Sequence, residues 1–235
     1  MQAGAAVRSG LDYTRGHPEP GGTVQTVLIA NPKGGSGKTT LATNLAGLLA
    51  GKKQRVVLAD EDRQQSSAQW LARRPALFPP ILAMPDEKRE LRAIEPHWMV
   101  VDSPAALAGD TLKEEMRRAD AVLVPISPSA FDMAATGEFL GRLAQTRSVK
   151  DGATPVGLVG MRVDSRTRSA ADLDEFLKQF PFPVIAHLRD TQLYVYGARD
   201  GLSVFDMPRS RAEQDREQWR PLARWVGRLA SAQAA

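Results

Sequence analysis

The sequence contains no cysteine, and this absence removes several kinds of chemistry at once. Disulfides, thiolate metal ligands, cysteine nucleophiles and protein-bound iron–sulfur clusters all require a cysteine sulfur. No apolar run approaches the roughly 20 residues that a membrane-spanning helix needs. The three histidines are scattered along the chain and indicate no metal site. The chemistry of this chain must therefore use other side chains, mainly carboxylates, hydroxyls, lysines and arginines, together with backbone groups.

Length and charge narrow the possibilities further. The 235 residues are enough for one full domain and too few for two comfortable ones. Residues 1–22 are rich in glycine and proline and lack the apolar core of a signal peptide. We therefore expect a disordered leader there, followed by a single domain over residues 23–235. The formal net charge of +4 permits contact with nucleic acid or anionic lipid but demands neither.

Short apolar segments rich in β-branched residues alternate with segments of helical periodicity. This alternation predicts an α/β fold with a mostly parallel sheet flanked by helices on both faces. The expected strands are residues 24–30, 55–60, 97–102, 121–126, 155–161 and 183–186. The expected helices are residues 39–49, 66–74, 112–119, 132–143 and 170–180, with a tail helix that begins at Ser210 and is kinked or restarted at Pro221.

The segment Lys-Gly-Gly-Ser-Gly-Lys-Thr-Thr, residues 33–40, lies between the first strand and the first helix. Its glycines let backbone N–H groups turn inward around anionic oxygens, and the N-terminus of the following helix adds a positive dipole end. In such a phosphate loop Lys38 reaches the β- and γ-phosphates, and the Thr39 hydroxyl binds Mg²⁺. The expected nucleotide-binding residues are Lys33, Gly34, Gly35, Ser36, Gly37, Lys38, Thr39 and Thr40.

Two aspartates end strands that should lie near this loop. Asp60 closes the second strand and Asp102 the third, and in a parallel sheet both carboxylates meet the loop at the carboxyl edge. Asp102 follows apolar residues, as a Walker B acid does, and can hold Mg²⁺ directly or through water. A carboxylate at Asp60 or Asp62 can orient or deprotonate the water that attacks the γ-phosphate. The alternative for each acid is a structural role in capping a turn.

Lys33 is a second lysine at the start of the loop, and ordinary phosphate loops do not require it. With this lysine the motif resembles the deviant Walker A motif of the ParA/MinD ATPases, and the resemblance covers nearly all of residues 24–235. Two segments are similar to the second and third motifs of that family, and two more to its short plasmid-partition members of the ParF type. These segments are residues 57–64 and 101–105, and residues 124–132 and 192–205, respectively.

The resemblance implies slow hydrolysis of ATP by a homodimer that forms when ATP is bound. Lys33 would reach the nucleotide of the other protomer, Lys38 would bind phosphate, and Asp62 would position the hydrolytic water, which makes these three the catalytic candidates. Thr40 would contact the α-phosphate. Loss of the γ-phosphate would loosen the dimer, and a cargo-bound or centromere-binding activator would speed this step. The residues that would hold Mg²⁺ are Thr39, Asp60 and Asp102.

The sequence departs from the family pattern at two places. Arg63 replaces the usual proline of the second motif, which leaves the conformation of that loop open. Met161 and Arg162 stand where relatives often have an asparagine and a basic residue near the adenine, so no base contacts are carried over. Nitrogenase iron proteins and arsenite ATPases share the loop but need cysteines. Metabolic P-loop ligases remain an alternative, although they usually lack the extra lysine.

Two groups of arginines could bind an anionic partner. One group recurs every four residues on the tail helix and forms a basic stripe, and the other follows a strand. Non-specific contacts to DNA phosphates would explain both groups, whereas the simplest alternative is a solvated surface paired with nearby acids. A lipid-binding helix like that of MinD is a third possibility, and Pro221 argues against it. The residues are Arg216, Arg220, Arg224 and Arg228 on the tail helix, and Arg162, Arg166 and Arg168 after the strand.

The leading hypothesis from sequence is a cytoplasmic, nucleoid-associated ATPase that partitions or positions DNA or a large cargo. It would dimerise with ATP, bind DNA without sequence preference and respond to a partner attached to the cargo. The alternatives are a MinD-like switch on a membrane and a metabolic ligase that needs a small acceptor substrate. The identity of the cargo belongs to the partner and is not encoded in these motifs.

Overall fold

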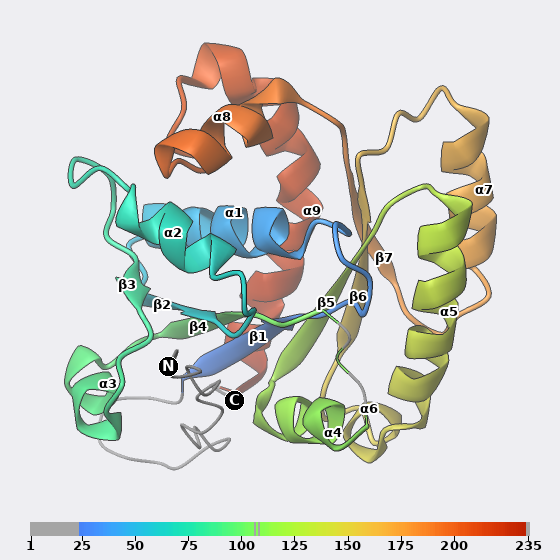
Figure 1. Ribbon diagram of the computed structural model, residues 1–235, viewed down its shortest axis with the longest axis horizontal. Coiled ribbons are helices and arrows are strands. Elements are labelled where there is room, and N and C mark those ends of the chain that lie inside the picture. Colours follow the sequence, from blue (N-terminus) through green and yellow to red (C-terminus); the bar gives the residue numbers. More distant parts are fainter. Residues whose placement is uncertain (1–23, 106, 108, 234–235) are drawn as a thin grey trace, which may run out of the picture.

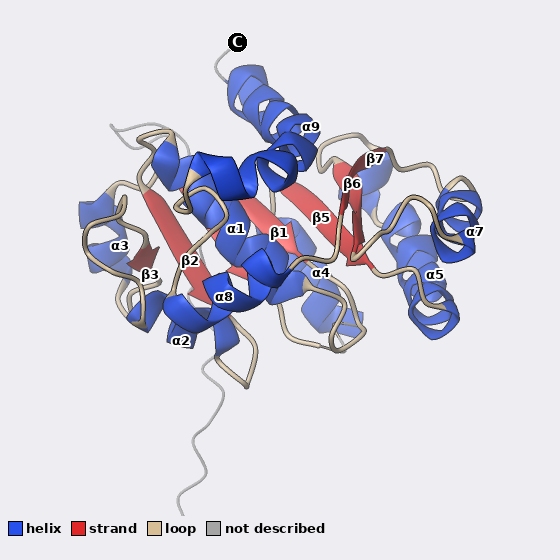
Figure 2. Ribbon diagram, turned by 90° about the horizontal axis from the view of Figure 1, so that it is seen from above, coloured by secondary structure: helices blue, strands red, loops and turns tan. Residues whose placement is uncertain are grey.

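The computed structural model describes residues 24–233, except 106 and 108, so the predicted leader lies outside the described residues. Its framework is a seven-stranded sheet with the strand order β3-β2-β4-β1-β5-β6-β7 (Figure 1). Every neighbouring pair of strands is parallel, and helices cover both faces of the sheet (Figure 2). The predicted fold class is confirmed.

Strands and helices alternate along most of the chain. The strands are β1 (Gln25–Ile29), β2 (Val56–Asp60), β3 (Leu82–Ala83), β4 (Trp98–Asp102), β5 (Ala121–Ile126), β6 (Val156–Met161) and β7 (Val184–Leu188). The helices are α1 (Lys38–Gly51), α2 (Ser66–Ala72), α3 (Lys88–Ile94), α4 (Gly109–Arg118), α5 (Ala130–Gln145), α6 (Arg147–Lys150), α7 (Arg168–Leu177), α8 (Gln192–Asp200) and α9 (Arg209–Gln233). None of these described helices combines the length and the apolar character that crossing a membrane requires.

The two faces of the sheet carry separate hydrophobic cores, because side chains along a strand point alternately to opposite faces. On β1, Val27 and Ile29 belong to the core beneath α1, α2 and α9, and Leu28 belongs to the core beneath α4, α5 and α7. Trp219 of α9 fills the first core and Leu140 of α5 the second, and both are fully buried. A strand with apolar residues on both sides belongs in the interior of such a sheet.

Strand β1 lies between β4 and β5 and holds the centre of the sheet. The chain leaves β1 toward β2 on one side and returns to β5 on the other, and ligands of parallel sheets bind where the strand order changes direction in this way. The register pairs Asp102 with Ile29 of β1 and with Asp60 of β2. The phosphate loop therefore shares the carboxyl edge of the sheet with both acids, as the sequence predicts.

All six predicted strands are present, and each predicted helix is present with shifted ends. Four further elements were not predicted, namely β3, α3, α8 and the four-residue helix α6. Strand β3 has only two residues, and α3 has no buried residue, so neither shows a clear periodic signal. In α8 only Gly197 is buried, which removes the apolar stripe that marks a helix in sequence. Helix α5 begins at Ala130 and not at Asp132, with Ser129 as its N-cap.

The sequence predicts that Pro221 kinks or restarts the tail helix, and the restart does not occur. Helix α9 runs from Arg209 to Gln233 with Pro221 inside it. A proline in a helix interior removes one backbone donor and normally breaks the helix. Here Leu222 and Trp225 on the next turn are buried in the core beneath α9, and this packing holds the helix together across the proline.

A network of contacts fastens the C-terminal end of α2 to α8 and to the segment that joins α8 to α9. The indole of Trp70 donates to the carbonyl of Gly197 at 3.1 Å. Arg74 forms a 2.8 Å ion pair with Asp206, and both side chains are almost fully buried. Gly201 has a left-handed backbone (φ 71°), and a Cβ atom added there would lie 2.5 Å from the backbone nitrogen of Arg74. The chain requires glycine at this position for two separate reasons.

Two glycine substitutions test this packing as a matched pair. Gly201→Ala should lower the free energy of unfolding by on the order of 2 kcal/mol or more, because it combines left-handed strain with a backbone clash. Gly227 is exposed on α9, and a Cβ atom added there would have no atom within 4 Å. Gly227→Ala should therefore raise the free energy of unfolding by about 0.5–1 kcal/mol. Urea unfolding of both variants measures the difference. Equal effects of the two substitutions would contradict the packing described for Gly201.

Candidate functional site

The phosphate loop closes around the N-terminus of α1. Gly35 (φ 77°) and Gly37 (φ 99°) both adopt a left-handed backbone, which would strain a residue with a side chain. Gly37 is the N-cap residue of α1, and no described side chain caps the helix there. The first N–H groups of the helix are therefore available to an anion, which the helix dipole also attracts. This geometry fits a phosphate group.

Lys38 is folded into the loop at only 7% exposure. Its Nζ donates to the carbonyls of Asn31 at 3.1 Å and Lys33 at 3.2 Å. Burial lowers the pKa of Lys38, and the negative charges of Asp102 and Asp62 oppose this shift. The loop thus holds one positive charge among backbone groups, where the sequence predicts the lysine that binds the β- and γ-phosphates.

Thr39 and Asp102 meet beside the loop. The Thr39 hydroxyl donates to Asp102 Oδ2 at 2.8 Å. Asp102 is 1% exposed, and this burial raises its pKa to about 7, with a smaller upward contribution from the negative charge of Asp60. The hydrogen bond from Thr39 opposes the shift. The carboxyl group of Asp102 is therefore costly to ionise unless a cation comes next to it.

The same two side chains fit a Mg²⁺ ion. Asp102 Oδ1 is buried and has no hydrogen-bond partner among the described residues, which leaves a carboxylate oxygen open for coordination. A hydroxyl and a carboxylate are the ligands that Mg²⁺ takes in phosphate-loop proteins, and water and phosphate oxygens complete the octahedron. Within the described ranges, no three His, Cys, Asp or Glu residues cluster to hold a metal alone. The ion would thus depend on the nucleotide for its remaining ligands.

Asp60 and Asp62 organise the loop that follows β2. Asp60 accepts backbone N–H groups through both oxygens, from Asp62 at 3.0 Å and from Ala68 in the first turn of α2 at 2.8 Å. Asp62 accepts from Gln64 at 2.9 Å and, across the site, from the backbone N–H of Ala105 at 3.1 Å. Asp62 therefore ties together the loops after β2 and β4, next to Lys38. Asp60 caps the start of α2 as well as lying beside Asp102.

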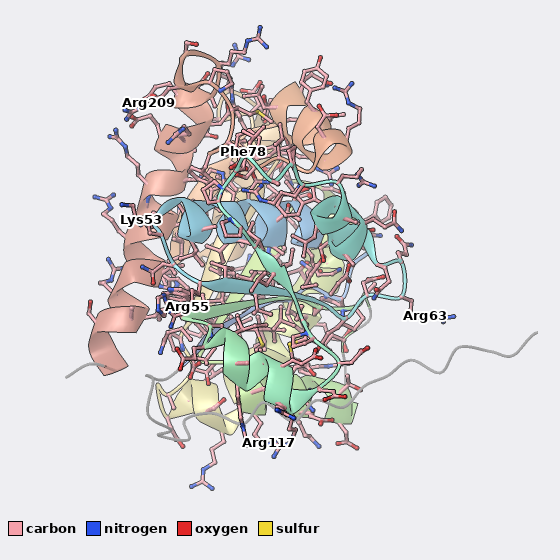
Figure 3. The ribbon with its side chains drawn as sticks, turned by 90° about the vertical axis from the view of Figure 1, so that its left-hand side faces the viewer. Lys53, Arg55, Arg63, Phe78, Arg117 and Arg209 are labelled. Carbon is pink, nitrogen blue, oxygen red and sulfur yellow. The ribbon has the colours of Figure 1, made fainter. Side chains whose placement is uncertain are left out.

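The loop after β2 closes without the proline of the family motif. The backbone N–H of Gln65 donates to the carbonyl of Asp62 at 3.0 Å and completes the turn. Arg63 is exposed, and in Figure 3 it stands at the edge of the molecule, away from the sheet. Arg63 therefore takes the place of the proline without disturbing the contacts of Asp62.

Lys33 differs from Lys38 in its surroundings. The side chain of Lys33 is 42% exposed, and its Nζ lies 3.9 Å from Asp132 Oδ1 at the start of α5. Thr40, expected at the α-phosphate, lies half-buried on the first turn of α1. The structure thus gathers Lys33, Lys38, Thr39, Thr40, Asp60, Asp62 and Asp102 along one edge of the sheet.

Sequence reasoning missed the residues that hold the loop from outside. Asn31 is fully buried, and its side-chain amide donates to the carbonyl of Pro125 at 2.7 Å and to the Thr136 hydroxyl at 3.0 Å, while its oxygen accepts from the backbone N–H of Lys33 at 2.8 Å. Asn31 adjoins the motif, so its position was a usable signal. Its partner Thr136 on α5 carried no signal in the sequence.

The predicted basic cluster after β6 divides in the structure. Arg162 donates to the carbonyl of Gly35 in the phosphate loop. Arg166 pairs with Asp164 at 2.9 Å, and Arg168 begins α7. The three arginines therefore have different surroundings, and Arg162 contacts the phosphate loop.

The sheet, the glycine-rich loop, the buried lysine and the Thr39–Asp102 pair define a P-loop nucleotide-binding protein. Residues 27–202 match the family model described as the CobQ/CobB/MinD/ParA nucleotide binding domain. The chain belongs to this family and is a P-loop ATPase of the ParA/MinD type.

Individual relatives agree with this assignment. The chain is 30% identical over 210 residues to the maintenance of carboxysome distribution protein A of Gloeobacter kilaueensis, covering 87% of this chain and 94% of the relative. It is 29% identical over 232 residues to the chromosome partitioning protein ParA of Myxococcus xanthus, covering 76% and 80%. The septum site-determining protein MinD of Pyrococcus horikoshii, solved with Mg-ADP, has the same fold, with a TM-score of 0.66 at 17% identity over 88% of this chain and 97% of that one.

The raised pKa of Asp102 predicts a specific pH dependence of stability. The folded protein holds the proton of Asp102 up to about pH 7, whereas the unfolded value is 3.8, so this group favours folding at low pH and loses that contribution as pH rises through this range. In nucleotide-free protein with a chelator, Asp102→Asn should therefore remove part of the fall in unfolding free energy between pH 4 and pH 7. Denaturant unfolding at several pH values measures this change in the free energy of unfolding.

Asp172→Asn is the matched control, because Asp172 is exposed on α7 and its substitution removes one negative charge away from the site. The pH dependence of this control should follow that of the wild type. If Asp102→Asn also followed the wild type, the burial of Asp102 would not be a source of its pH dependence.

Proposed function

We propose that this chain is an ATP- and Mg²⁺-dependent dimerising ATPase that positions DNA or a large cargo on non-specifically bound DNA. The observation that carries this proposal is the contrast between the two lysines of the phosphate loop. Lys38 is buried and hydrogen-bonded to nearby carbonyls, whereas the side chain of Lys33 is 42% exposed and forms one 3.9 Å ion pair among the described residues. A lysine at the surface of a phosphate site can bind the phosphates of the nucleotide in a second protomer. ATP would then become part of the dimer contact.

The names of the relatives support the cargo-positioning part of the proposal. Two kinds of positioning are named, carboxysome distribution in one relative and chromosome partitioning in the other. Both names refer to the distribution of a large body, a carboxysome or a chromosome. We infer that this chain likewise positions a large cargo, and that a partner protein bound to the cargo stimulates hydrolysis.

Asp62 is the residue that best fits the hydrolytic step. Its carboxylate lies near enough to Lys38 to affect the pKa of that lysine, and it receives one N–H from each of two loops at the carboxyl edge. A carboxylate fixed in this way can orient a water molecule toward the γ-phosphate. Asp102 and Thr39 would hold Mg²⁺, which neutralises charge on the phosphates.

The first test of the proposal separates ATP binding from turnover. Asp62→Ala should bind ATP with Mg²⁺ yet release phosphate at least about 100-fold more slowly, since a general base contributes roughly 10²–10⁴-fold. A dimer should then accumulate in ATP, measurable by light scattering. Asp62→Asn removes the carboxylate charge, and its single amide oxygen keeps an acceptor for one of the two N–H groups that Asp62 binds. Asp86→Ala, at an exposed aspartate, is the control for charge loss.

Three outcomes of this test would count against the proposal. Normal turnover in both Asp62 variants would remove Asp62 from the reaction. Loss of ATP binding without any dimer would assign Asp62 to the structure of the loop. A wild-type protein that stayed monomeric with ATP, ADP and no nucleotide alike would contradict the dimer itself.

The surface we propose for DNA lies along α9. Arg224 and Arg228 are exposed, and Arg220 is exposed but paired with Glu217 at 2.6 Å. Arg216 is half-buried, with its guanidinium over the ring of Phe205 at 5.6 Å, so it is the least available of the four.

Basic residues from other elements extend this surface. A groove of about 500 Å³ is lined by Lys52 after α1 together with Arg220 and Arg224 of α9. Figure 3 faces this side of the molecule and labels Lys53, Arg55 and Arg209 on it. Basic side chains from α9, from the turn after α1 and from the start of β2 could therefore meet phosphates of one DNA backbone.

The packing of α9 favours DNA over a lipid surface. A helix that lies on a membrane needs a free apolar face. In α9 the large apolar residues Trp219, Leu222, Trp225 and Val226 are buried against the sheet. The outward residues that remain in the described part of α9 are mainly charged or small.

The second test addresses this surface. Arg220→Ala combined with Arg224→Ala should weaken binding to unrelated DNA sequences and reduce the slope of log affinity against log salt by about two per protomer. ATP-driven dimerisation should stay intact. Arg142→Ala with Arg147→Ala, on α5 and α6, removes the same charge elsewhere and should have less effect. Equal effects of the two double variants would show that net charge, and not this surface, governs binding, and a strong preference for one DNA sequence would contradict non-specific binding.

A further inference from the structure

Arg162 lies at the end of β6 and contacts the phosphate loop from outside. Its guanidinium donates to the carbonyl oxygen of Gly35, which is 127 residues away in the chain. The residues on both sides of Arg162 are firmly held. Met161 is buried, and Val163 is buried with its backbone N–H bonded to the carbonyl of Leu188 at 3.0 Å. The exposed side chain of Arg162 therefore extends from a backbone that both neighbouring residues hold in place.

The backbone of Arg162 is unusual for its residue type. Its φ angle of 55° lies in the left-handed region, which is unfavourable for a residue with a Cβ atom and often marks a functional site. Met161, just before it, packs beneath the loop, since a Cβ atom added to Gly37 would lie 3.0 Å from Met161 Cε. Two consecutive residues therefore contact the loop, one beneath Gly37 and one at Gly35.

The contact to Gly35 has a direct consequence for the next backbone N–H. In a trans peptide the C=O of one residue and the N–H of the following residue point in opposite directions. When Arg162 holds the Gly35 carbonyl, the Ser36 N–H must point away from Arg162. Among the described residues, none accepts a hydrogen bond from this N–H, so it is free to bind a phosphate oxygen.

A loop of this composition needs such a restraint. Gly34 and Gly35 have no atoms within 4 Å of an added Cβ position, so packing around their α-carbons does not fix the peptides next to them. Glycine also allows many backbone conformations at little cost. A charge-assisted hydrogen bond to one carbonyl selects one orientation of the Gly35–Ser36 peptide.

We propose that Arg162 is a positioning residue that orients the Gly35–Ser36 peptide, so that the Ser36 N–H is directed into the phosphate site before nucleotide binds. The role rests on the proposed nucleotide binding by this loop, and it acts on the phosphates and not on the base. This positioning role differs from the DNA binding that we propose for the arginines of α9.

The test uses two variants that differ in backbone strain. Arg162→Ala and Arg162→Gly both remove the guanidinium, but only glycine relieves the left-handed strain, so the melting temperature of the glycine variant should exceed that of the alanine variant. Both should nevertheless bind ADP and ATP on the order of tenfold more weakly than wild type, as expected for loss of one charge-assisted hydrogen bond. Arg162→Lys should recover part of the affinity. Isothermal calorimetry and thermal unfolding give the two quantities.

Pyrophosphate binding and hydrogen exchange test whether Arg162 acts through the phosphates and through the Ser36 amide. The loss of affinity for pyrophosphate should match the loss for ADP, because the effect passes through the phosphates. In nucleotide-free protein, the amide of Ser36 should exchange with solvent at a different rate in Arg162→Ala than in wild type, while Arg166→Ala, at an exposed arginine nearby, should change neither exchange nor affinity.

Three results would overturn the proposal. These are unchanged nucleotide affinity in both variants, weaker ADP binding with unchanged pyrophosphate binding, and affinity losses that follow the melting temperatures. The result for wild type decides the underlying function separately. If wild-type protein bound no ADP, and behaved like Lys38→Ala in the same titration, the proposed nucleotide binding would itself be wrong.

Discussion

The structure depends on one constraint, which is that a short stretch of backbone must keep its N–H groups free for a ligand. Elsewhere in a folded chain, buried N–H groups pair with carbonyls and this pairing fixes the backbone. The phosphate loop forgoes part of that pairing, so its shape must come from contacts made around it. Asn31 fixes its start, Lys38 donates to the carbonyls of Asn31 and Lys33, and Met161 and Arg162 contact it from the end of β6. The central position of β1 brings these elements together.

The three aspartates of the site have two different kinds of surroundings. Asp102 is buried where its charge is unfavourable, whereas Asp60 and Asp62 each accept two backbone N–H groups. Ionisation of the buried carboxyl group of Asp102 becomes favourable when a divalent cation lies next to it, whereas hydrogen bonds already hold the carboxyl groups of Asp60 and Asp62 in place. The two kinds of aspartate therefore suit two different tasks beside the same phosphate loop.

The sequence predicted those parts of the site that are local in the chain. The loop of residues 33–40 is contiguous, and Asp60 and Asp102 were recognisable because each follows an apolar strand. The strands were visible because β-branched apolar runs are hard to mistake in a buried sheet. Helix α8 was missed because its side chains are mostly exposed, and Pro221 was misjudged because packing on one side of α9 outweighs the missing backbone donor. Contacts such as Asn31 to Thr136 and Arg162 to Gly35, which join residues 105 and 127 positions apart, arise only from the tertiary arrangement.

The contacts of Trp70 and Arg74 have a mechanical consequence. Helix α2 begins directly after the loop that contains Asp62, and these two residues near its C-terminal end bond to Gly197 and Asp206 in the region that leads into α9. Because the Arg74–Asp206 pair is buried, separating its charges would leave both uncompensated. A shift of α2 on a change at the phosphates would either break this linkage or carry the start of α9 with it. The contacts of Trp70 and Arg74 thus connect the loop that contains Asp62 to the helix that bears the basic stripe.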